Sequence, residues 1–145
     1  MRKRVCVTVL VMIYDGDKIL LQNRINKKTS GLSFLSGHVE DDDSIFMTAI
    51  REVKEETNLN ISNLRLAGIK EYYSGDNKYL SILVKTNKFE GELKSSEEGE
   101  VNWYTLDEIE QRDDLSEHFM ATLKLFTDDD LSELIVLSDQ QSVTI

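Results

Sequence analysis

The feature that most restricts the fold is an uninterrupted apolar run near the start of the chain. The run extends from Val5 to Tyr14, and valine or isoleucine occupies every second position from Val5 to Ile13. Such a run is typical of a strand that is buried on both faces, because a half-buried strand alternates apolar and polar residues. Asp15–Asp17 then predicts a turn, and Lys18–Arg24 predicts the returning strand. The sheet that contains this strand must therefore be covered on both sides.

The same run has an alternative interpretation as a secretory signal, since it follows the basic start Met1–Arg4. However, the small-residue cleavage pattern is missing, and the run is too short for a bilayer, which needs about 20 apolar residues. The chain has a single cysteine, Cys6, so it forms no internal disulfide and suits a reducing compartment. We therefore expect a cytoplasmic protein.

The remainder of the chain predicts further strands and helices. No segment rich in Pro, Gly or Ser divides the 145 residues, so we expect one domain over residues 1–145. The irregular alternation of elements favours an α/β fold with a mixed sheet covered by helices. The expected strands are Leu64–Tyr73, Tyr79–Phe89 and Val101–Tyr104, with a turn at Ser74–Asn77, and the expected helices are Leu106–Gln111 and Leu115–Phe126. The tail from Asp128 fits a helix end or a last strand, and its apolar residues Leu134–Leu137 either close the core or join two copies in a homodimer.

The charge of the chain excludes one class of partner. It has 17 basic and 27 acidic side chains, which gives a formal net charge of −10. Broad electrostatic attraction to a nucleic-acid polymer or to an anionic membrane is therefore not expected. A small anionic ligand is still compatible, provided that a metal ion neutralises its charge locally.

Ile45–Thr57 is the segment that most directly indicates chemistry. On a helix, its apolar residues fall on one arc, and Glu52, Glu55 and Glu56 cluster on an adjacent arc. Taken alone, such an acidic arc is usually a solvated face. Its context favours another interpretation, because Leu35–Glu40, which contains a glycine, is expected to form a loop just before the helix. Carboxylates that face a tight glycine turn can hold magnesium, an ion that assists attack on a phosphoanhydride.

The spacing of these residues resembles the signature of the Nudix family of nucleoside-diphosphate-linked hydrolases. That signature is G-x5-E-x7-R-E-U-x-E-E-x-G-U, where U is a bulky apolar residue. This chain has Gly37, Asp43, Arg51 and then Glu52–Leu59 in the same register.

The chain departs from the signature at three positions. Asp43 replaces a glutamate, and Ser36 replaces a glycine that often precedes the first signature residue. Asn58 replaces a glycine just after the helix, where a left-handed residue is wanted and asparagine is the usual second choice. None of these departures removes an expected metal ligand, so we expect activity to survive them.

The resemblance implies an α/β/α sandwich with a mixed sheet and hydrolysis that depends on Mg²⁺ or Mn²⁺. The implied metal ligands are the Gly37 carbonyl, Glu52, Glu55, Glu56 and Glu98. Arg51 is expected to orient the glutamates and to pair with Asp43. The general base is either Glu52 or Glu98, acting through a water molecule.

Two site residues come from outside the signature. Arg24 ends a segment that resembles the second strand of the family, where an arginine often meets the substrate phosphates; a solvated strand end is the alternative. Glu98 is chosen by its distance from Trp103, and Glu97 and Glu100 remain alternatives.

The substrate is a nucleotide, and its identity is the least defined expectation. The short chain and the run Glu98–Trp103 resemble the MutT-like branch, which hydrolyses 8-oxo-dGTP to the monophosphate and pyrophosphate. Ser33 stands where some members of that branch place an asparagine against guanine, and Phe34 and His38 are candidate substrate contacts by position. Packing or solvent exposure is the alternative for each of them.

Other functions stay open at this stage. A Nudix hydrolase of this kind could act on ADP-ribose, a nucleotide sugar or a dinucleoside polyphosphate instead. A non-catalytic nucleotide sensor would use the same fold. In a plain interaction module, the acidic helix would serve solubility alone.

Overall fold

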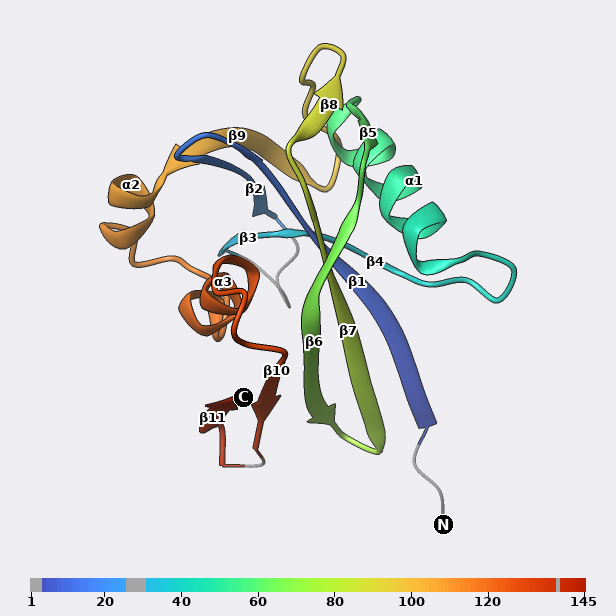
Figure 1. The fold of residues 1–145 in the computed structure, drawn as a ribbon, viewed down its shortest axis with the longest axis vertical. Helices are drawn as coiled ribbons and strands as arrows, with labels where there is room; N and C mark the ends of the chain where they lie inside the picture. Colours follow the sequence, from blue (N-terminus) through green and yellow to red (C-terminus); the bar gives the residue numbers. More distant parts are fainter. Residues whose placement is uncertain (1–3, 26–30, 138) are drawn as a thin grey trace.

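A long twisted sheet with helices on both faces organises the chain (Figure 1). The computed structural model describes residues 4–25, 31–137 and 139–145, so Met1–Lys3 of the basic start lie outside the described residues. The strands are β1 (Arg4–Asp15), β2 (Lys18–Arg24), β3 (Gly31–Ser33), β4 (Leu35–His38), β5 (Asn60–Ser62), β6 (Arg65–Ser74), β7 (Asn77–Thr86), β8 (Lys88–Glu90), β9 (Gly99–Thr105), β10 (Glu133–Val136) and β11 (Ser142–Thr144). The helices are α1 (Ile45–Thr57), α2 (Leu106–Glu110) and α3 (Phe119–Thr127).

The main sheet is mixed and forks beside β1. Its strand order is β11-β10-β6-β7-β1-β2-β3, and β4 and β9 join it by pairing with β1 and β2. β1 runs parallel to β7 and meets β2 near its own end, where Tyr14 is the Cα partner of Ile19. Nearer its start, β1 pairs with β4 instead, over Thr8–Val11. Because β2 continues alongside β9 and β3, the sheet opens into two branches, β2 and β4.

Two hydrophobic cores lie on opposite faces of this sheet. One core packs Ala49 and Val53 of α1 against β1, and the other packs α2 and α3 against the opposite face through residues such as Phe119 and Phe126. Figure 1 shows α1 on one side of the sheet and α2 and α3 on the other. The expected α/β/α sandwich with a mixed sheet is therefore confirmed.

The expectation that β1 is buried on both faces holds for only part of the strand. From Val9 to Ile13 most side chains are buried, whereas Val5 is 52% exposed. The start of β1 extends beyond the helices that cover the sheet, so its first residues lack a covering layer (Figure 1).

Three expectations about elements are wrong. Leu35–Glu40 is not simply a loop, because Leu35–His38 forms β4 on β1. The helix expected from Leu115 begins at Phe119; Leu115 forms a bridge to Leu32, and the Ser116 N–H donates to the Leu32 carbonyl over 3.0 Å. The strand expected as Tyr79–Phe89 is divided, since β7 ends at Thr86 and β8 pairs with β5 in a separate small sheet.

The tail forms strands. β10 lies parallel to β6, and β11 pairs with β10. Leu134 and Val136 are buried and close the core below α3, while Leu137 is exposed. Across the described ranges, no helix combines the length and the apolar character required to span a lipid bilayer.

Candidate functional site

Local sequence fixes both ends of α1, the helix that carries the acidic residues. The Ser44 hydroxyl accepts a hydrogen bond from the Met47 N–H over 3.1 Å, which caps the start of the helix. Asn58 ends it in the left-handed conformation, with φ of 66°, and its N–H donates to the Lys54 carbonyl. The expected left-handed residue at Asn58 is therefore confirmed. Since Ala49 and Val53 anchor the helix to the sheet, its glutamates are held at a fixed orientation.

Gly37 and Glu52 are in direct contact. A Cβ atom on Gly37 would lie 2.3 Å from Glu52 Cγ and 2.4 Å from Glu52 Cδ, far inside van der Waals distance. The Glu52 side chain is 16% exposed. Any side chain on Gly37 would therefore displace Glu52, so the glycine is needed for this packing.

Arg51 links the loop before the helix to two of the glutamates. It forms an ion pair with Asp43, as expected from the sequence. Its Nη2 lies 3.7 Å from Glu52 Oε1, and its Nε lies 3.9 Å from Glu55 Oε1. Arg51 is thus placed to orient both carboxylates. Glu55 is more open to solvent, with 62% of its side chain exposed.

Glu56 is a buried carboxyl beside other acidic groups. It is 2% exposed, and Oε2 has no hydrogen-bond partner among the residues described. Burial, a hydrogen bond with Glu98 and the charges of Glu98 and Glu52 raise the pKa of Glu56 to about 9, against the lowering effect of Arg24. Burial and the charge of Glu55 also raise the pKa of Glu52, although Arg51 opposes this. Of Glu97, Glu98 and Glu100, Glu98 is thus the one placed beside Glu56.

This group of carboxylates fits a hard divalent cation. Within residues 4–25, 31–137 and 139–145, no three Asp, Glu, His or Cys groups already stand close enough together to hold an ion. Glu98 nevertheless raises the pKa of both Glu52 and Glu56, and one buried oxygen of Glu56 lacks a partner among the described residues. Oxygen ligands of this kind are those that Mg²⁺ and Mn²⁺ prefer, and a cation would offset their mutual repulsion.

Arg24 faces the carboxylates from the other branch of the fork. It ends β2 and is half-buried, and its Nη2 donates a hydrogen bond to Ser36 Oγ on β4. Its charge lowers the pKa of Glu56, and its Nε has no partner in the part of the chain that the structure describes. A guanidinium in this position has donors left for an anionic ligand.

The three residues considered as substrate contacts, Ser33, Phe34 and His38, do not point toward one common site. His38 is exposed at the end of β4 and, by strand alternation, lies on the opposite face from Gly37. Phe34 is buried and stacks on Phe119, with ring centroids 4.7 Å apart. Ser33 pairs with Gln22 across β3 and β2. A role for each in binding the substrate stays a prediction.

Sequence reasoning missed Gln22. Its side chain is fully buried, and neither amide atom has a hydrogen-bond partner among the described residues. The available signal was a polar residue directly after the apolar run Ile19–Leu21 in a strand.

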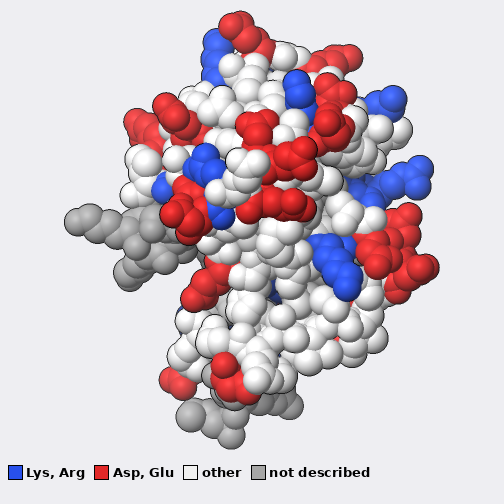
Figure 2. Space-filling model, turned by 90° about the vertical axis from the view of Figure 1, so that its left-hand side faces the viewer, with Lys and Arg blue, Asp and Glu red and all other residues white. Residues whose placement is uncertain are grey.

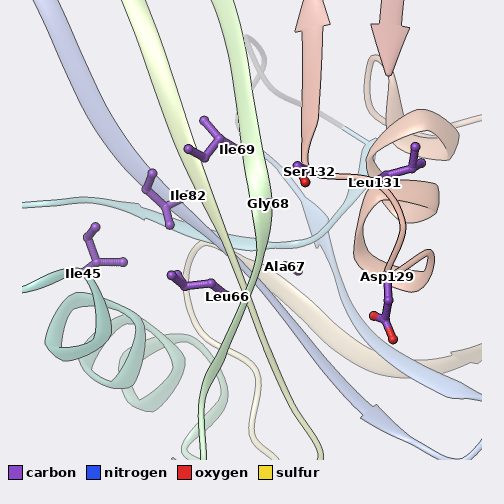
Figure 3. Close-up of a pocket in the computed structure, with 9 residues that line it drawn as sticks. All are labelled: Ile45, Leu66, Ala67, Gly68, Ile69, Ile82, Asp129, Leu131 and Ser132. Carbon is purple, nitrogen blue, oxygen red and sulfur yellow. The ribbon is translucent and has the colours of Figure 1, made fainter. Parts of the chain in front are cut away.

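A cavity in the structure lies away from these residues. It has a volume of about 460 Å³ and is lined mainly by apolar side chains of β6, β7 and the start of α1 (Figure 3). Ile45 begins α1 and Glu56 lies near its end, so the helical rise separates them by roughly 16 Å. The close-up labels one charged residue there, Asp129, and no cationic group that would hold a phosphate.

The molecular surface agrees with the acidic composition. Figure 2 shows acidic side chains gathered over the upper half of one face, with a few basic side chains among them. This face presents no continuous basic track of the kind that follows a nucleic-acid backbone.

Comparisons with known proteins agree on one family. The family model described as NUDIX domain matches residues 4–123. The NAD-capped RNA hydrolase NudC of Actinobacillus succinogenes is 29% identical over 109 residues, which cover 72% of this chain and 41% of that protein. The chain thus spans about two fifths of the length of the curated relatives that it matches.

Solved structures with the same fold include two MutT proteins. A MutT protein from Bacillus halodurans matches with a TM-score of 0.74 and 22% identity, covering 95% of this chain and 94% of that one. A MutT NUDIX hydrolase from Burkholderia pseudomallei matches with a TM-score of 0.76 and 18% identity, covering 86% of this chain and 100% of that one. At these identities, the likeness shows the fold alone.

Proposed function

This chain belongs to the NUDIX domain family, and we propose that it is a hydrolase that uses Mg²⁺ or Mn²⁺ to cleave a phosphoanhydride bond of a nucleotide. One observation carries the proposal. The buried Glu56 carboxyl lies beside Glu98 and Glu52 with an unpartnered oxygen. Burial of a carboxyl beside two others is costly for the folded chain unless a proton or a cation compensates it, so a bound divalent cation accounts for the arrangement.

Each site residue has a role in this proposal. Glu52, Glu55, Glu56 and Glu98, with the Gly37 carbonyl, would hold the ion, which when bound neutralises phosphate charge and lowers the pKa of a water molecule. Arg51 holds Glu52 and Glu55 in orientation through the contacts described above. Glu52 or Glu98 accepts the proton of the attacking water. Arg24 donates hydrogen bonds to a phosphate oxygen of the substrate.

The substrate we propose is a nucleoside triphosphate, with 8-oxo-dGTP as the first to test. Attack would release the monophosphate and pyrophosphate. The resemblance of the run Glu98–Trp103 to the MutT-like branch supports this choice, and the fold matches MutT structures. We place Ser33, Phe34 and His38 among the substrate contacts, in a cytoplasmic protein that binds neither a nucleic-acid polymer nor a membrane.

A second candidate substrate is a nucleotide with an internal pyrophosphate bridge, such as ADP-ribose, a nucleotide sugar or a dinucleotide. The curated relatives that match most of this chain are named for NAD-capped RNA, and NAD contains such a bridge. Cleavage of that bridge would release two monophosphates and no pyrophosphate. Product identity therefore separates the two candidates.

The experiment is a substrate panel with product analysis. Purified protein is incubated with Mg²⁺ or Mn²⁺ and with canonical and oxidised nucleoside triphosphates, ADP-ribose, NAD and nucleotide sugars. We expect turnover of at least one nucleotide, and a loss of at least about 100-fold in Glu52→Gln. Glu110→Gln, which changes an exposed glutamate of α2, is the matched control and should keep full activity.

Two results would reject the proposal. Tight nucleotide binding without turnover would indicate a sensor. Calorimetry that shows no metal-dependent binding of any nucleotide would indicate an interaction module with a solubilising acidic helix.

A further inference from the structure

Buried polar atoms without partners gather at the fork of the sheet. In the described part of the chain, such side-chain atoms belong to four residues, and they are Gln22 Nε2 and Oε1, Arg24 Nε, Ser33 Oγ and Glu56 Oε2. Gln22 and Ser33 are Cα partners across β2 and β3. Arg24 follows on the same strand, and its charge reaches Glu56. Three of the four residues of this cluster thus lie on the paired strands β2 and β3, and the fourth, Glu56, lies within electrostatic reach of Arg24.

Among these four residues, Gln22 is the one whose burial is not explained by the stability of the fold. It is 0% exposed and follows Leu20 and Leu21 in the middle of the core. A buried amide without partners destabilises a folded chain, and an apolar side chain of similar volume would not. A residue that breaks the local rule in this way is expected at a functional site.

The backbone places Gln22 next to the acidic residues. Gln22 and Arg24 pair with Val101 and Gly99 of β9. A Cβ atom on Gly99 would lie 3.2 Å from Gln22 Cγ, so this glycine allows β9 to approach the Gln22 side chain closely. Glu98, which precedes Gly99, raises the pKa of Glu56 and therefore lies close to its carboxyl. Gln22 thus lies beside the segment that brings Glu98 to Glu56.

The chemistry of the cluster fits a water molecule. Gln22 and Ser33 each offer a donor and an acceptor, Arg24 offers a donor, and Glu56 offers an acceptor. A pure anion site would contain donors only, whereas an ordered internal water needs two to four polar partners of both kinds. We propose that Gln22 is a positioning residue that, with Ser33, holds an ordered water between Glu56 and Arg24.

This water would orient two groups at the same time. They are the Glu56 carboxylate, which would bind the metal ion, and the Arg24 guanidinium, which would bind a phosphate. The inference rests on the proposed function, because Glu56 is taken as a metal ligand. Partners of this kind commonly change metal affinity by about 10–100-fold when they are removed.

The test compares Gln22→Met with a control on the same strand, Leu20→Met. Mn²⁺ binding is measured by calorimetry without nucleotide, and stability is measured by urea denaturation in EDTA. The values of kcat and KM are measured on the best substrate.

For Gln22→Met we expect the Kd for Mn²⁺ to rise at least about tenfold and kcat to fall, with an unchanged or higher urea midpoint. Gln22→Asn, which keeps an amide, should lie between Gln22→Met and the wild type. Leu20→Met should leave Mn²⁺ affinity unchanged.

Undiminished Mn²⁺ binding in Gln22→Met would overturn the inference, and a lower urea midpoint beside it would reduce Gln22 to a structural role. If Gln22→Met does not fold, Ser33→Ala takes its place, and unchanged Mn²⁺ affinity there is equally decisive. Failure of the wild type to bind Mn²⁺ would instead reject the proposed function and this inference with it.

Discussion

Glu56 couples the stability of the protein to pH. Its pKa is about 9 in the folded chain and 4.5 for an ordinary glutamate, so between these values the folded chain binds one proton more than the unfolded chain. The stabilisation from this proton is complete below the unfolded pKa and is lost as pH rises through the folded pKa. In EDTA, we expect the free energy of unfolding to fall between pH 6 and 9, by at most about 1.4 kcal/mol per pH unit from this group.

Glu56→Gln should flatten this decline, because a glutamine does not titrate. At pH 8.5 the variant should be more stable than the wild type by about 1–3 kcal/mol in EDTA. Urea denaturation across the pH range measures both quantities. An equally steep decline in Glu56→Gln would assign the pH dependence to other groups, and Glu110→Gln provides the control for removal of a glutamate.

Gly37→Ala tests the contact between β4 and Glu52. The added Cβ would lie 2.3 Å from Glu52 Cγ, so the glutamate must move away from its place beside Arg51. We expect Mn²⁺ affinity, measured by calorimetry, and turnover to fall by about 10–100-fold. Gly75→Ala is the control, because Gly75 lies in a turn where a Cβ meets no atom within 4 Å. Equal effects of the two substitutions would mean that the contact is irrelevant to the site.

Site residues that lie close together in the sequence could be predicted, whereas those that folding brings together from distant segments could not. The pairing of Arg51 with Asp43 is predicted correctly because Asp43 lies just before α1 and Arg51 lies within it, eight positions later. Gln22 gave only a weak signal, because its importance depends on Ser33, Gly99 and Glu56, which come from three other segments. The choice of Glu98 rested on its distance from Trp103 in the sequence, and only the folded chain places it beside Glu56.

At the scale of the elements, the residue that ends α1 can be tested by substitution. Asn58 adopts φ of 66°, and its side chain Nδ2 donates to the Glu92 carbonyl over 2.9 Å. Asn58→Ala should lower the free energy of unfolding by about 1–2 kcal/mol, because alanine is strained in the left-handed region. Asn58→Gly should change it by less than about 1 kcal/mol, since an easier backbone offsets the lost hydrogen bond. Urea denaturation would contradict this account if glycine were the more damaging substitution.

The elements that were predicted correctly are those specified by neighbouring residues. The helix Ile45–Thr57 and the turn at Gly75 and Asp76 follow from local patterns, and the structure confirms both elements, although Phe46 and Ile50 of the apolar arc are exposed. β4 was missed because Leu35–His38 has no alternating pattern, and it becomes a strand only by pairing with β1. Leu115 likewise continues a helical spacing, but its backbone pairs with Leu32. Pairing with a distant strand overrides local propensity in both cases.

For the molecule as a whole, metal binding should raise thermal stability. A ligand that binds the folded chain alone stabilises it by about 2.7 kcal/mol at one hundred times its Kd. For a chain of 145 residues, this corresponds to a rise in Tm of roughly 5–10 °C. Differential scanning calorimetry with Mn²⁺ measures the shift, with NaCl at equal ionic strength as the control. Glu52→Gln should show a smaller rise, and an identical rise would place the bound ion elsewhere.

The division of β1 between two neighbours separates two tasks in space. Arg24 stands on the β2 branch, whereas Gly37, with Glu52 packed against it, belongs to the β4 branch. Substitutions at Arg24 can therefore alter how tightly a substrate binds while the contact between Gly37 and Glu52 keeps its geometry. A chain built in this manner can acquire new substrate preferences through a single residue at the end of one strand.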